Sequence, residues 1–368
     1  MKNTIKAAAL LAAASITLAA CGSAPTAESG QASGGTAAQK TSDVKACMVS
    51  DEGGFDDQSF NQSGKEGLDR AGTELGVEVK TAESKSDGDY QVNTDAMIQD
   101  GCDLIIGVGY KLATVLTTAA QANPDVKFAL VDSTFSDNNG NAVEVPNGRP
   151  LIFNTAEAAF LAGYLSAGMT STGKVGTFGG MEIPTVQIFM EGFAKGVDQY
   201  NADNGSDVKV LGWDDKTHKG SFVGDFSSVD KGQQMTNQLI SQGADIIMPV
   251  AGPVGAGTIA AINASANADK LKAVWVDADG QLSNGDKHIM TSVMKQIGNS
   301  VFDTVKAVQD GTFDSSPYIG TLSNDGVSLA PFYDFDSQIP QELKTKLDDL
   351  KQKIVSGSLD VSTEYDPS

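Results

Sequence analysis

Residues 51–62, DEGGFDDQSFNQ, place four acidic side chains and two phenylalanines directly after the apolar run VKACMVS. Adjacent carboxylates such as Asp56 and Asp57 can serve general acid and base catalysis, but no nucleophile with an attached base stands beside them. Carboxylates, amides and isolated aromatic rings are equally suited to holding a polar ligand. The segment therefore favours binding over catalysis, and we expect no enzymatic activity.

Segments of the same character follow other apolar runs: GVGYKL, VDSTF, AGPVGAG, VDADGQ and TSVMKQ. GVGYKL has Leu112 at the third glycine position of a dinucleotide-binding fingerprint. AGPVGAG lacks the lysine and the hydroxyl residue of a phosphate-binding loop. Glycines in such segments instead let the backbone approach a neutral ligand or a packing partner. The sequence thus predicts no cofactor.

Composition argues against two further kinds of site. The two histidines, His218 and His288, lie far apart in the chain without a second ligand at metal-binding spacing, so we expect no metal and place both at the surface. The formal net charge of the 368 residues is -21 and the pI is about 4.3. A phosphate backbone would be repelled by this charge, which predicts no nucleic-acid partner.

The polar segments need a scaffold that brings them together, and the chain alternates short apolar runs with amphipathic stretches. This alternation predicts an α/β fold with parallel sheets covered by helices on both faces. The patterns MIQDGCDLIIGVG and LISQGADIIMPVAG are alike, so we expect two similar, doubly wound lobes. Ligands of open α/β sheets bind at the carboxyl ends of strands, which is where the polar segments lie.

The N-terminus indicates where the protein works. Lys2 and Lys6 precede the run AAALLAAASITLAA, whose length fits a signal peptide over residues 1–20 better than a membrane span. The following LAAC resembles the lipobox of bacterial lipoproteins, in which Cys21 would be lipidated; the alternative is a chance cysteine after an ordinary export signal. Residues 21–43 hold almost no large apolar side chain and are expected to form a flexible tether.

Two more cysteines, Cys47 and Cys102, lie within or beside predicted strands. Free cysteine behaves as a small apolar residue and is often buried. We therefore expect two buried free thiols, with a disulfide as the alternative.

The segment SDEGGFDDQSFNQSGKEG resembles the opening of the basic membrane protein (BMP) family of PnrA-like, nucleoside-binding lipoproteins, the substrate-binding components of ABC-type importers. Further similar segments run along nearly the whole mature chain, the longest being AEAAFLAGYLSAGMTSTGKVGTFGGMEIPTV. The resemblance implies a periplasmic-binding-protein type I fold, with two lobes joined by crossing strands and a purine nucleoside in the cleft. It also implies a permease and an ATPase as partners, a membrane contact through the lipid anchor alone, and a monomer.

In the family, one aromatic ring from each lobe clamps the base. Phe60 in QSFNQ matches the first ring. The second is either Phe222 or Phe226 in KGSFVGDFSSVDKGQQ, and counting back from QGAD reaches Phe226 without a gap. We therefore predict that Phe60 and Phe226 stack on the ligand.

The same match assigns polar contacts. The base edge would be met by Asp51, Asn61 and Asp132, the ribose hydroxyls by Asp277 and Lys295, and Gly252 would bring backbone against the ligand. Buried ligand groups left unpaired cost about 1–3 kcal/mol each, so these contacts are needed. Which nucleoside is preferred stays open.

We place the N-lobe at residues 44–153 with a return segment at about 296–330, and the C-lobe at 154–295 with a C-terminal helix at about 331–368. Three other functions stay open on the same architecture. They are a sugar-binding protein, a sensory nucleoside-binding lipoprotein, and an α/β enzyme that acts on nucleosides.

Overall fold

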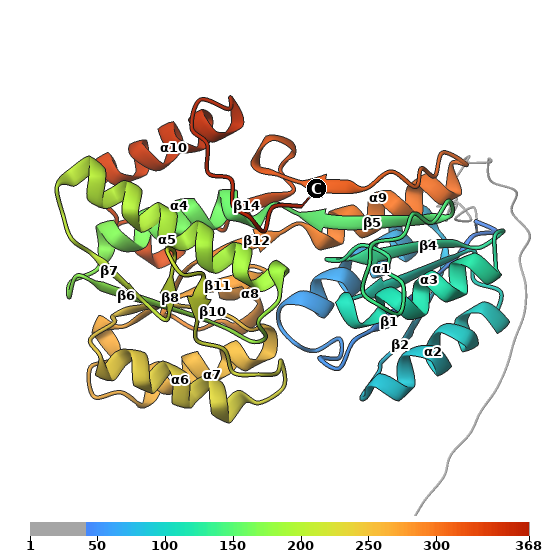
Figure 1. The fold of residues 1–368 in the computed structure, drawn as a ribbon, viewed down its shortest axis with the longest axis horizontal. Coiled ribbons are helices and arrows are strands. Elements are labelled where there is room, and N and C mark those ends of the chain that lie inside the picture. Colours follow the sequence, from blue (N-terminus) through green and yellow to red (C-terminus); the bar gives the residue numbers. More distant parts are fainter. Residues whose placement is uncertain (1–41, 368) are drawn as a thin grey trace, which may run out of the picture. The chain divides into compact units, whose positions relative to one another are not determined.

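The computed structural model describes residues 42–367 and contains two six-stranded sheets (Figure 1). The first has the order β13-β5-β4-β3-β1-β2, and all neighbouring strands in it are parallel. Its strands are β1 (Lys45–Ser50), β2 (Glu78–Ala82), β3 (Leu104–Val108), β4 (Lys127–Val131), β5 (Gly148–Phe153) and β13 (Tyr318–Gly320).

The second sheet has the order β14-β12-β11-β10-β6-β7 and is parallel except for its edge strand β14, which pairs antiparallel with β12. Its strands are β6 (Lys174–Gly179), β7 (Lys209–Leu211), β10 (Ile246–Val250), β11 (Lys272–Asp277), β12 (Ile289–Lys295) and β14 (Val327–Leu329). A short hairpin, β8 (Trp213–Asp214) and β9 (Lys219–Gly220), follows β7.

Helices cover both sheets. The first sheet contacts α1 (Phe60–Leu75), α2 (Asp87–Gln99), α3 (Ala113–Ala122) and α9 (Ile297–Gln309). The second group of helices comprises α4 (Thr155–Met169), α5 (Pro184–Asn204), α6 (Val229–Ser241), α7 (Ala256–Ala264), α8 (Gly280–Asn284) and α10 (Gln341–Val355). We call the first sheet with its four helices the first lobe, and the second sheet with the others the second lobe.

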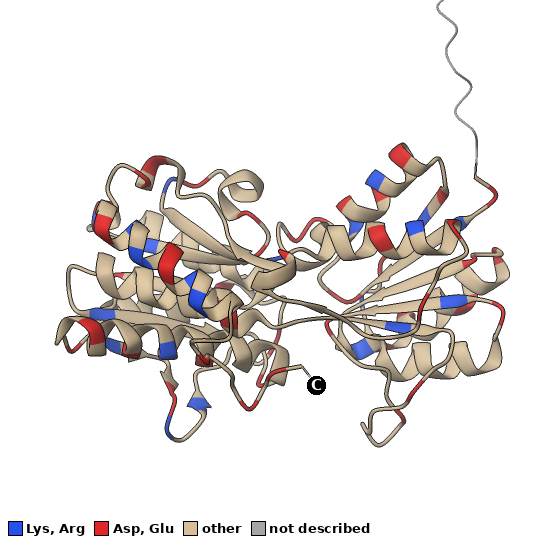
Figure 2. Cartoon of the chain, turned by 90° about the horizontal axis from the view of Figure 1, so that it is seen from above, with Lys and Arg blue, Asp and Glu red and all other residues tan. Residues whose placement is uncertain are grey.

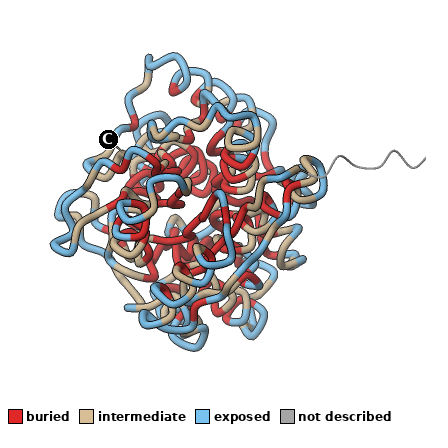
Figure 3. The backbone as a smooth tube through the Cα atoms, turned by 90° about the vertical axis from the view of Figure 1, so that its right-hand side faces the viewer, coloured by how far each residue is buried: buried red, intermediate tan, exposed pale blue. Residues whose placement is uncertain are grey.

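Strand β1 shows why the apolar runs form central strands. Successive side chains of a strand point to opposite faces. Ala46 and Met48 pack in the core beneath α1, whereas Cys47 and Val49 pack in a separate core with side chains of α2 and α3. Because both faces of the sheet are covered, the strand is apolar throughout rather than alternating. Figure 3 shows such buried segments in the interior and exposed segments at the periphery.

Helix α4 is buried on nearly every side, which explains its continuous apolar sequence. It packs closely on α5 because glycines lie where the two backbones meet. An added Cβ at Gly163 would lie 2.0 Å from the carbonyl oxygen of Phe193, and one at Gly196 would lie 2.0 Å from that of Phe160. This packing accounts for the small residues of the long central block.

The chain passes between the lobes three times: after β5, after β12, and between β13 and β14. The predicted return segment at 296–330 is therefore too long at its end. Residues 297–320 form α9 and β13 on the first lobe, but β14 pairs with β12 of the second. Strands of three residues carry too little periodicity to be assigned to a sheet from sequence.

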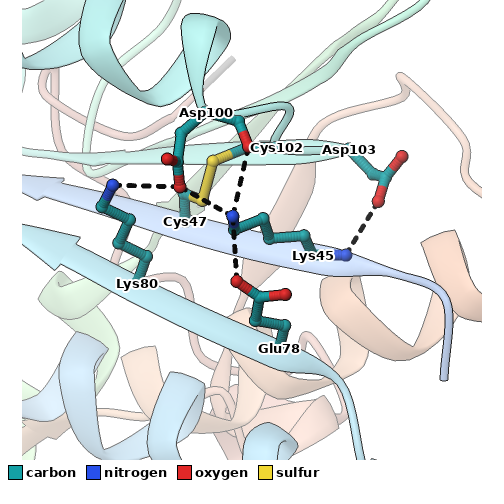
Figure 4. Close-up of a disulfide and its surroundings, with 7 residues drawn as sticks. All are labelled: Lys45, Cys47, Glu78, Lys80, Asp100, Cys102 and Asp103. Atoms are coloured by element: carbon teal, nitrogen blue, oxygen red, sulfur yellow. Dashed lines mark hydrogen bonds and ion pairs between the residues drawn. A yellow bond between two sulfur atoms is a disulfide. The ribbon is translucent and has the colours of Figure 1, made fainter. Parts of the chain in front are cut away.

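The expectation of two free thiols is wrong, because Cys47 and Cys102 form a disulfide with a Cα–Cα distance of 6.0 Å (Figure 4). Strands β1 and β3 are parallel neighbours, and Cys102 lies just before β3. Beside the disulfide, the Lys45 ammonium group contacts the carboxylates of Glu78 and Asp100 at 2.8 and 2.7 Å. A disulfide of this kind is typical of proteins from oxidising compartments.

Charged residues of both signs are distributed over the outer helices (Figure 2). Several form pairs one helical turn apart, as in Lys65–Asp69 of α1 and Lys353–Asp349 of α10. Among the helices of residues 42–367, none has the length and apolar character needed to cross a bilayer. The predicted signal peptide, Cys21 and most of the predicted tether fall in residues 1–41, outside the described part of the chain.

Candidate ligand-binding site

A cavity between the lobes brings together all eight residues that the sequence assigned to the ligand. It encloses about 580 Å³ of space outside the protein atoms, part of it open to solvent. The assigned residues follow β1, β4 and β10, end β11 and β12, start α1, or lie in the loop before α6. They are Asp51, Phe60, Asn61, Asp132, Phe226, Gly252, Asp277 and Lys295. The site thus forms at the carboxyl ends of strands from both sheets, as expected for open α/β sheets.

The first-lobe wall is built around the start of α1. The Asp57 carboxylate accepts hydrogen bonds from the backbone N–H groups of Ser59, Asn61 and Gln62, at 3.0, 2.8 and 3.0 Å. These are N–H groups that a helix start otherwise leaves unpaired. Burial raises the pKa of Asp57 to about 6, although the same hydrogen bonds oppose the shift. Asp57 therefore fixes the position of α1 and of the residues at its start.

Asn61 lies between two carboxylates. Its Nδ2 donates to Asp51 Oδ1 at 2.8 Å and to Asp57 Oδ2 at 3.2 Å. Burial raises the pKa of Asp51, opposed by hydrogen bonds from Asn61 and from the Gly53 backbone. Gly109 makes room for this carboxylate, because an added Cβ there would lie 2.5 Å from Asp51 Oδ2, and its φ of +105° also favours glycine.

Lys295 lies between two aspartates from different lobes. Its Nζ is 2.7 Å from Asp132 Oδ2 at the end of β4 and 3.5 Å from Asp277 Oδ1 at the end of β11. Lys295 is only 4% exposed. Burial opposes its charge, but the two carboxylates together raise the pKa of its ammonium group. Burial also raises the pKa of Asp132 against the attraction of Lys295, and the negative charge of Asp277 adds to the rise.

Backbone strain is concentrated at these carboxylates. Asp132 and Asp277 have φ values of 62° and 67°, in the left-handed region that non-glycine residues rarely adopt. Each follows or ends a buried strand, so the unusual conformation sets the direction in which the carboxylate leaves the sheet. Strained residues of this kind persist where the surrounding structure holds them, and they cluster at functional sites.

Aromatic rings line the cavity from both lobes. Phe60 comes from the first lobe and Phe226 from the second, and the ring of Phe226 would be 2.4 Å from an added Cβ at Gly180. Phe222 does not line this cavity but packs against Gly179, with which it forms an isolated bridge. The Lys295 Nζ lies 5.3 Å from the centre of the Phe60 ring and 5.0 Å from that of Phe189.

Several lining residues were not singled out from the sequence for the site: Gly53, Tyr110, Ile183, Thr185, Val186 and Phe189. Asp57 was noted as an acid but given no place at the ligand, although it lines the cavity too. Residues 183–189 lie at the start of α5, and their pattern is that of an ordinary amphipathic helix. Tyr110 could have been predicted from the sequence as a site residue, since GVGYKL follows a buried strand.

The two lobes also contact each other directly beside the cavity, through what we call the interlobe latch: Gln58 and Ser59 against Trp275, Val276, Asp277 and Ser283. The Gln58 carbonyl accepts hydrogen bonds from Trp275 Nε1 at 3.3 Å and from Ser283 Oγ at 3.0 Å. The Ser59 hydroxyl is 3.1 Å from both the Val276 carbonyl and Asp277 Oδ2. Gln58 itself has a φ of 56°, so the backbone that directs its carbonyl is also strained. The structure is therefore that of closed lobes.

Within residues 42–367 there is no group of three His, Cys, Asp or Glu residues arranged to hold a metal ion. The expectation that His288 lies at the surface is wrong, since it is 4% exposed and its Nδ1 lies 2.9 Å from Asp286 Oδ1. His218 has a side chain that is 38% exposed.

Comparison with known proteins identifies the family. A family model described as ABC transporter substrate-binding protein, PnrA-like (Bmp) matches residues 44–364. The ABC transporter nucleoside-binding protein BmpA of Lactococcus lactis is 30% identical, over 99% of this chain and 100% of its own. The CD4+ T-cell-stimulating antigen of Listeria innocua is 31% identical, over 96% of each chain.

Among solved structures, a solute-binding protein of an ABC transporter system from Aeropyrum pernix K1 superimposes with a TM-score of 0.75 and 25% identity. The match covers 86% of this chain and 92% of that one. The predicted two-lobed α/β periplasmic-binding-protein fold and the substrate-binding role are confirmed. This chain belongs to the Bmp family of PnrA-like substrate-binding proteins of ABC transporters.

Proposed function

We propose that this protein captures purine nucleosides in the interlobe cavity and delivers them to an ABC permease and its ATPase. The observation that carries the proposal is the joint lining of one cavity by Phe60, Phe226 and the carboxylates at the strand ends. A nucleoside needs a flat apolar slot for its base and hydrogen-bond partners for its base edge and ribose. Phe60 and Phe226 would supply the apolar faces and the strand-end carboxylates the hydrogen-bond partners, and the Lactococcus lactis relative is a nucleoside-binding protein by name.

The free energies expected from stacking and hydrogen bonding are large enough for nucleoside binding. Stacking on an aromatic side chain is worth about 1–3 kcal/mol per base, so two rings provide part of the roughly 8–12 kcal/mol that micromolar to nanomolar affinity requires. Hydrogen bonds to charged groups, about 1.5–3 kcal/mol each, supply the remainder and offset the ordering cost of closure. Asp51 and Asn61 would meet the base, and Asp277 with Lys295 would meet the ribose.

Phe60 gives the direct test of stacking. Replacing Phe60 with alanine should weaken binding of inosine or guanosine at least tenfold, since one ring face is lost. Isothermal titration calorimetry measures the change, and Phe60→Tyr, which keeps the ring, serves as the matched control. Unchanged affinity in the alanine variant would reject the stacking role.

The cell location follows from the N-terminal prediction together with the family. We propose that the mature protein is anchored through a lipid on Cys21 at the outer face of the bacterial cytoplasmic membrane and acts as a monomer. Metabolic labelling with a radioactive fatty acid tests the anchor: label should be incorporated by the full chain and not by Cys21→Ala.

Closure links binding to transport. A ligand held by both lobes binds the closed state better and shifts the population toward it, which gives the permease a shape to recognise. The interlobe latch would add to this stability, because its hydrogen bonds exist only when the lobes are closed.

Ser59 tests the latch. Replacing Ser59 with alanine should speed ligand dissociation about two- to tenfold, since a hydrogen bond contributes about 0.5–1.5 kcal/mol. Stopped-flow tryptophan fluorescence can follow the rate, because Trp275 lies at the latch. Ser63→Ala is the matched control: its hydroxyl donates to the Ser59 carbonyl within the first lobe. Equal dissociation rates in the Ser59 and Ser63 variants would exclude the latch role.

Thermal-shift screening of the purified protein against nucleosides, free bases and sugars separates the competing functions. Stabilisation by ribose or galactose alone would indicate a sugar-binding protein. Release of free base from a nucleoside, detected by liquid chromatography, would indicate an enzyme. Genes for permease and ATPase subunits beside the gene for this protein would favour transport over sensing.

A further inference from the structure

Asp51 and Asn61 line the cavity, and each carries an oxygen that is free to accept a hydrogen bond. The orientation of the Asn61 amide is set by its neighbours, because its NH₂ group donates to carboxylate oxygens of both Asp51 and Asp57. Turning the amide over would place its oxygen against the same two carboxylates. The oxygen therefore points away from them.

That oxygen has no partner. Asn61 is only 2% exposed, and its Oδ1 is buried without a hydrogen bond in the described residues 42–367. A buried unpaired acceptor is costly, and Asn61 lines the cavity, so a donor of the ligand would remove this cost. Asp51 adds a second acceptor. Its Oδ1 accepts hydrogen bonds from the Gly53 backbone N–H and from Asn61 Nδ2, whereas its Oδ2 accepts none from residues 42–367.

The backbone N–H groups and the second carboxylate beside these two residues already have hydrogen-bond partners within the protein. The backbone N–H of Gly53 donates to Asp51 Oδ1 at 3.0 Å, and that of Gly109 donates to the Val131 carbonyl at 3.2 Å. Both Asp57 oxygens are occupied by donors at the start of α1. Tyr110 also lines the cavity, but a tyrosine hydroxyl can donate or accept and so favours neither kind of ligand group.

We infer that this protein selects guanosine-type nucleosides, because two residues of the cavity wall, Asp51 and Asn61, each carry an acceptor oxygen that donors of residues 42–367 leave unpaired. Guanine supplies two adjacent donors, N1–H and the 2-amino group, on its Watson–Crick edge. Hypoxanthine supplies N1–H alone. Adenine presents an acceptor at N1, and cytosine and uracil each carry at most one donor position beside an acceptor. The inference rests on the proposed function, since it places the base edge at this wall.

Selectivity of this kind is a difference of affinities produced by unpaired groups. A site built to receive a donor rejects an analogue that lacks it far more strongly than an apolar pocket rejects a missing methylene group. We expect guanosine to bind about tenfold more tightly than inosine and at least about a hundredfold more tightly than adenosine. 1-Methylguanosine, which lacks N1–H, should bind at least about tenfold less tightly than guanosine.

Calorimetry of the purified protein with these four nucleosides tests the inference. Asp51→Asn provides the decisive variant, because the new amide can keep its oxygen toward Gly53 and Asn61 and present its NH₂ group to the ligand. It should lower the ratio of guanosine to adenosine affinity at least tenfold. A loss of folding would lower both affinities together and leave no such change of ratio.

Adenosine binding as tightly as guanosine to the unaltered protein would overturn the inference and leave the proposed function standing. An unchanged affinity ratio in a folded Asp51→Asn variant would also overturn it. Failure of every nucleoside to bind would instead remove the proposed function itself.

Discussion

Replacing Lys295 with methionine is expected to lower the free energy of unfolding by about 3–5 kcal/mol and to abolish measurable nucleoside binding. The loss follows from the two carboxylates that share this one cation, Asp132 at 2.7 Å and Asp277 at 3.5 Å. Both are nearly buried, so removing Lys295 leaves two negative charges close together without compensation. Chemical denaturation monitored by circular dichroism measures the change.

The loss of unfolding free energy in the Lys295→Met variant should become smaller as the pH falls. Burial already raises the pKa of Asp132, and the loss of Lys295 would raise it further. An acid whose folded-state pKa lies above its unfolded value binds its proton more tightly when folded. Its unfavourable effect is complete above the folded pKa, declines as pH falls through that pKa, and is gone below the unfolded pKa. The Lys295→Met variant should therefore regain stability relative to the unaltered protein as pH is lowered from neutral toward the unfolded pKa of an aspartate, about 4.

Lys344 offers the matched control. It also pairs with an aspartate, Asp336 at 2.8 Å, but that aspartate is 60% exposed at its side chain. Exposed pairs contribute about 0–1 kcal/mol, so Lys344→Met should change stability by no more than this. Equal small losses in both variants would contradict the view that Lys295 compensates buried charge.

Removing the disulfide is the second change with a large expected effect. Cys47 and Cys102 are 55 residues apart, and closing a loop of this size lowers the entropy of the unfolded chain by an amount worth about 4 kcal/mol. The double variant Cys47→Ala with Cys102→Ala should lose about that much stability in urea denaturation. The unaltered protein should lose a similar amount when unfolded in the presence of a reductant.

The reductant also supplies the control for this experiment, since it should leave the double variant unchanged. Thiol titration of the denatured, unreduced protein should detect neither Cys47 nor Cys102. Full reactivity of both thiols, or equal stability with and without reductant, would contradict the disulfide.

The sequence predicted the central strands and the polar segments after them from local patterns, and the family resemblance singled out the residues that line the cavity. Buried parallel strands are continuous apolar runs, and the polar segments after them lie at one edge of each sheet by the geometry of the fold. The prediction failed where the answer depended on topology. Cys47 meets Cys102 only because β1 and β3 are neighbours, which no spacing of 55 residues reveals.

Other differences have equally physical causes. Asp56 and Asp57 are adjacent acids, yet only Asp57 caps α1 and lines the cavity, because the turn before the helix directs the two side chains differently. Phe222 and Phe226 have similar surroundings in sequence, and the contact of Phe222 with Gly179 is visible only in three dimensions. The ligand contacts assigned to the eight site residues stay predictions until a complex is measured.

The three passages between the lobes have a consequence for synthesis. Strands β1 to β5 emerge early, but the first sheet gains its edge strand β13 and α1 gains its neighbour α9 only after about half of the chain has followed. Until then an apolar flank of the growing domain stays uncovered and open to aggregation. Neither lobe can therefore be obtained as one contiguous fragment. A nascent chain stopped near residue 290 would need a chaperone to remain able to fold.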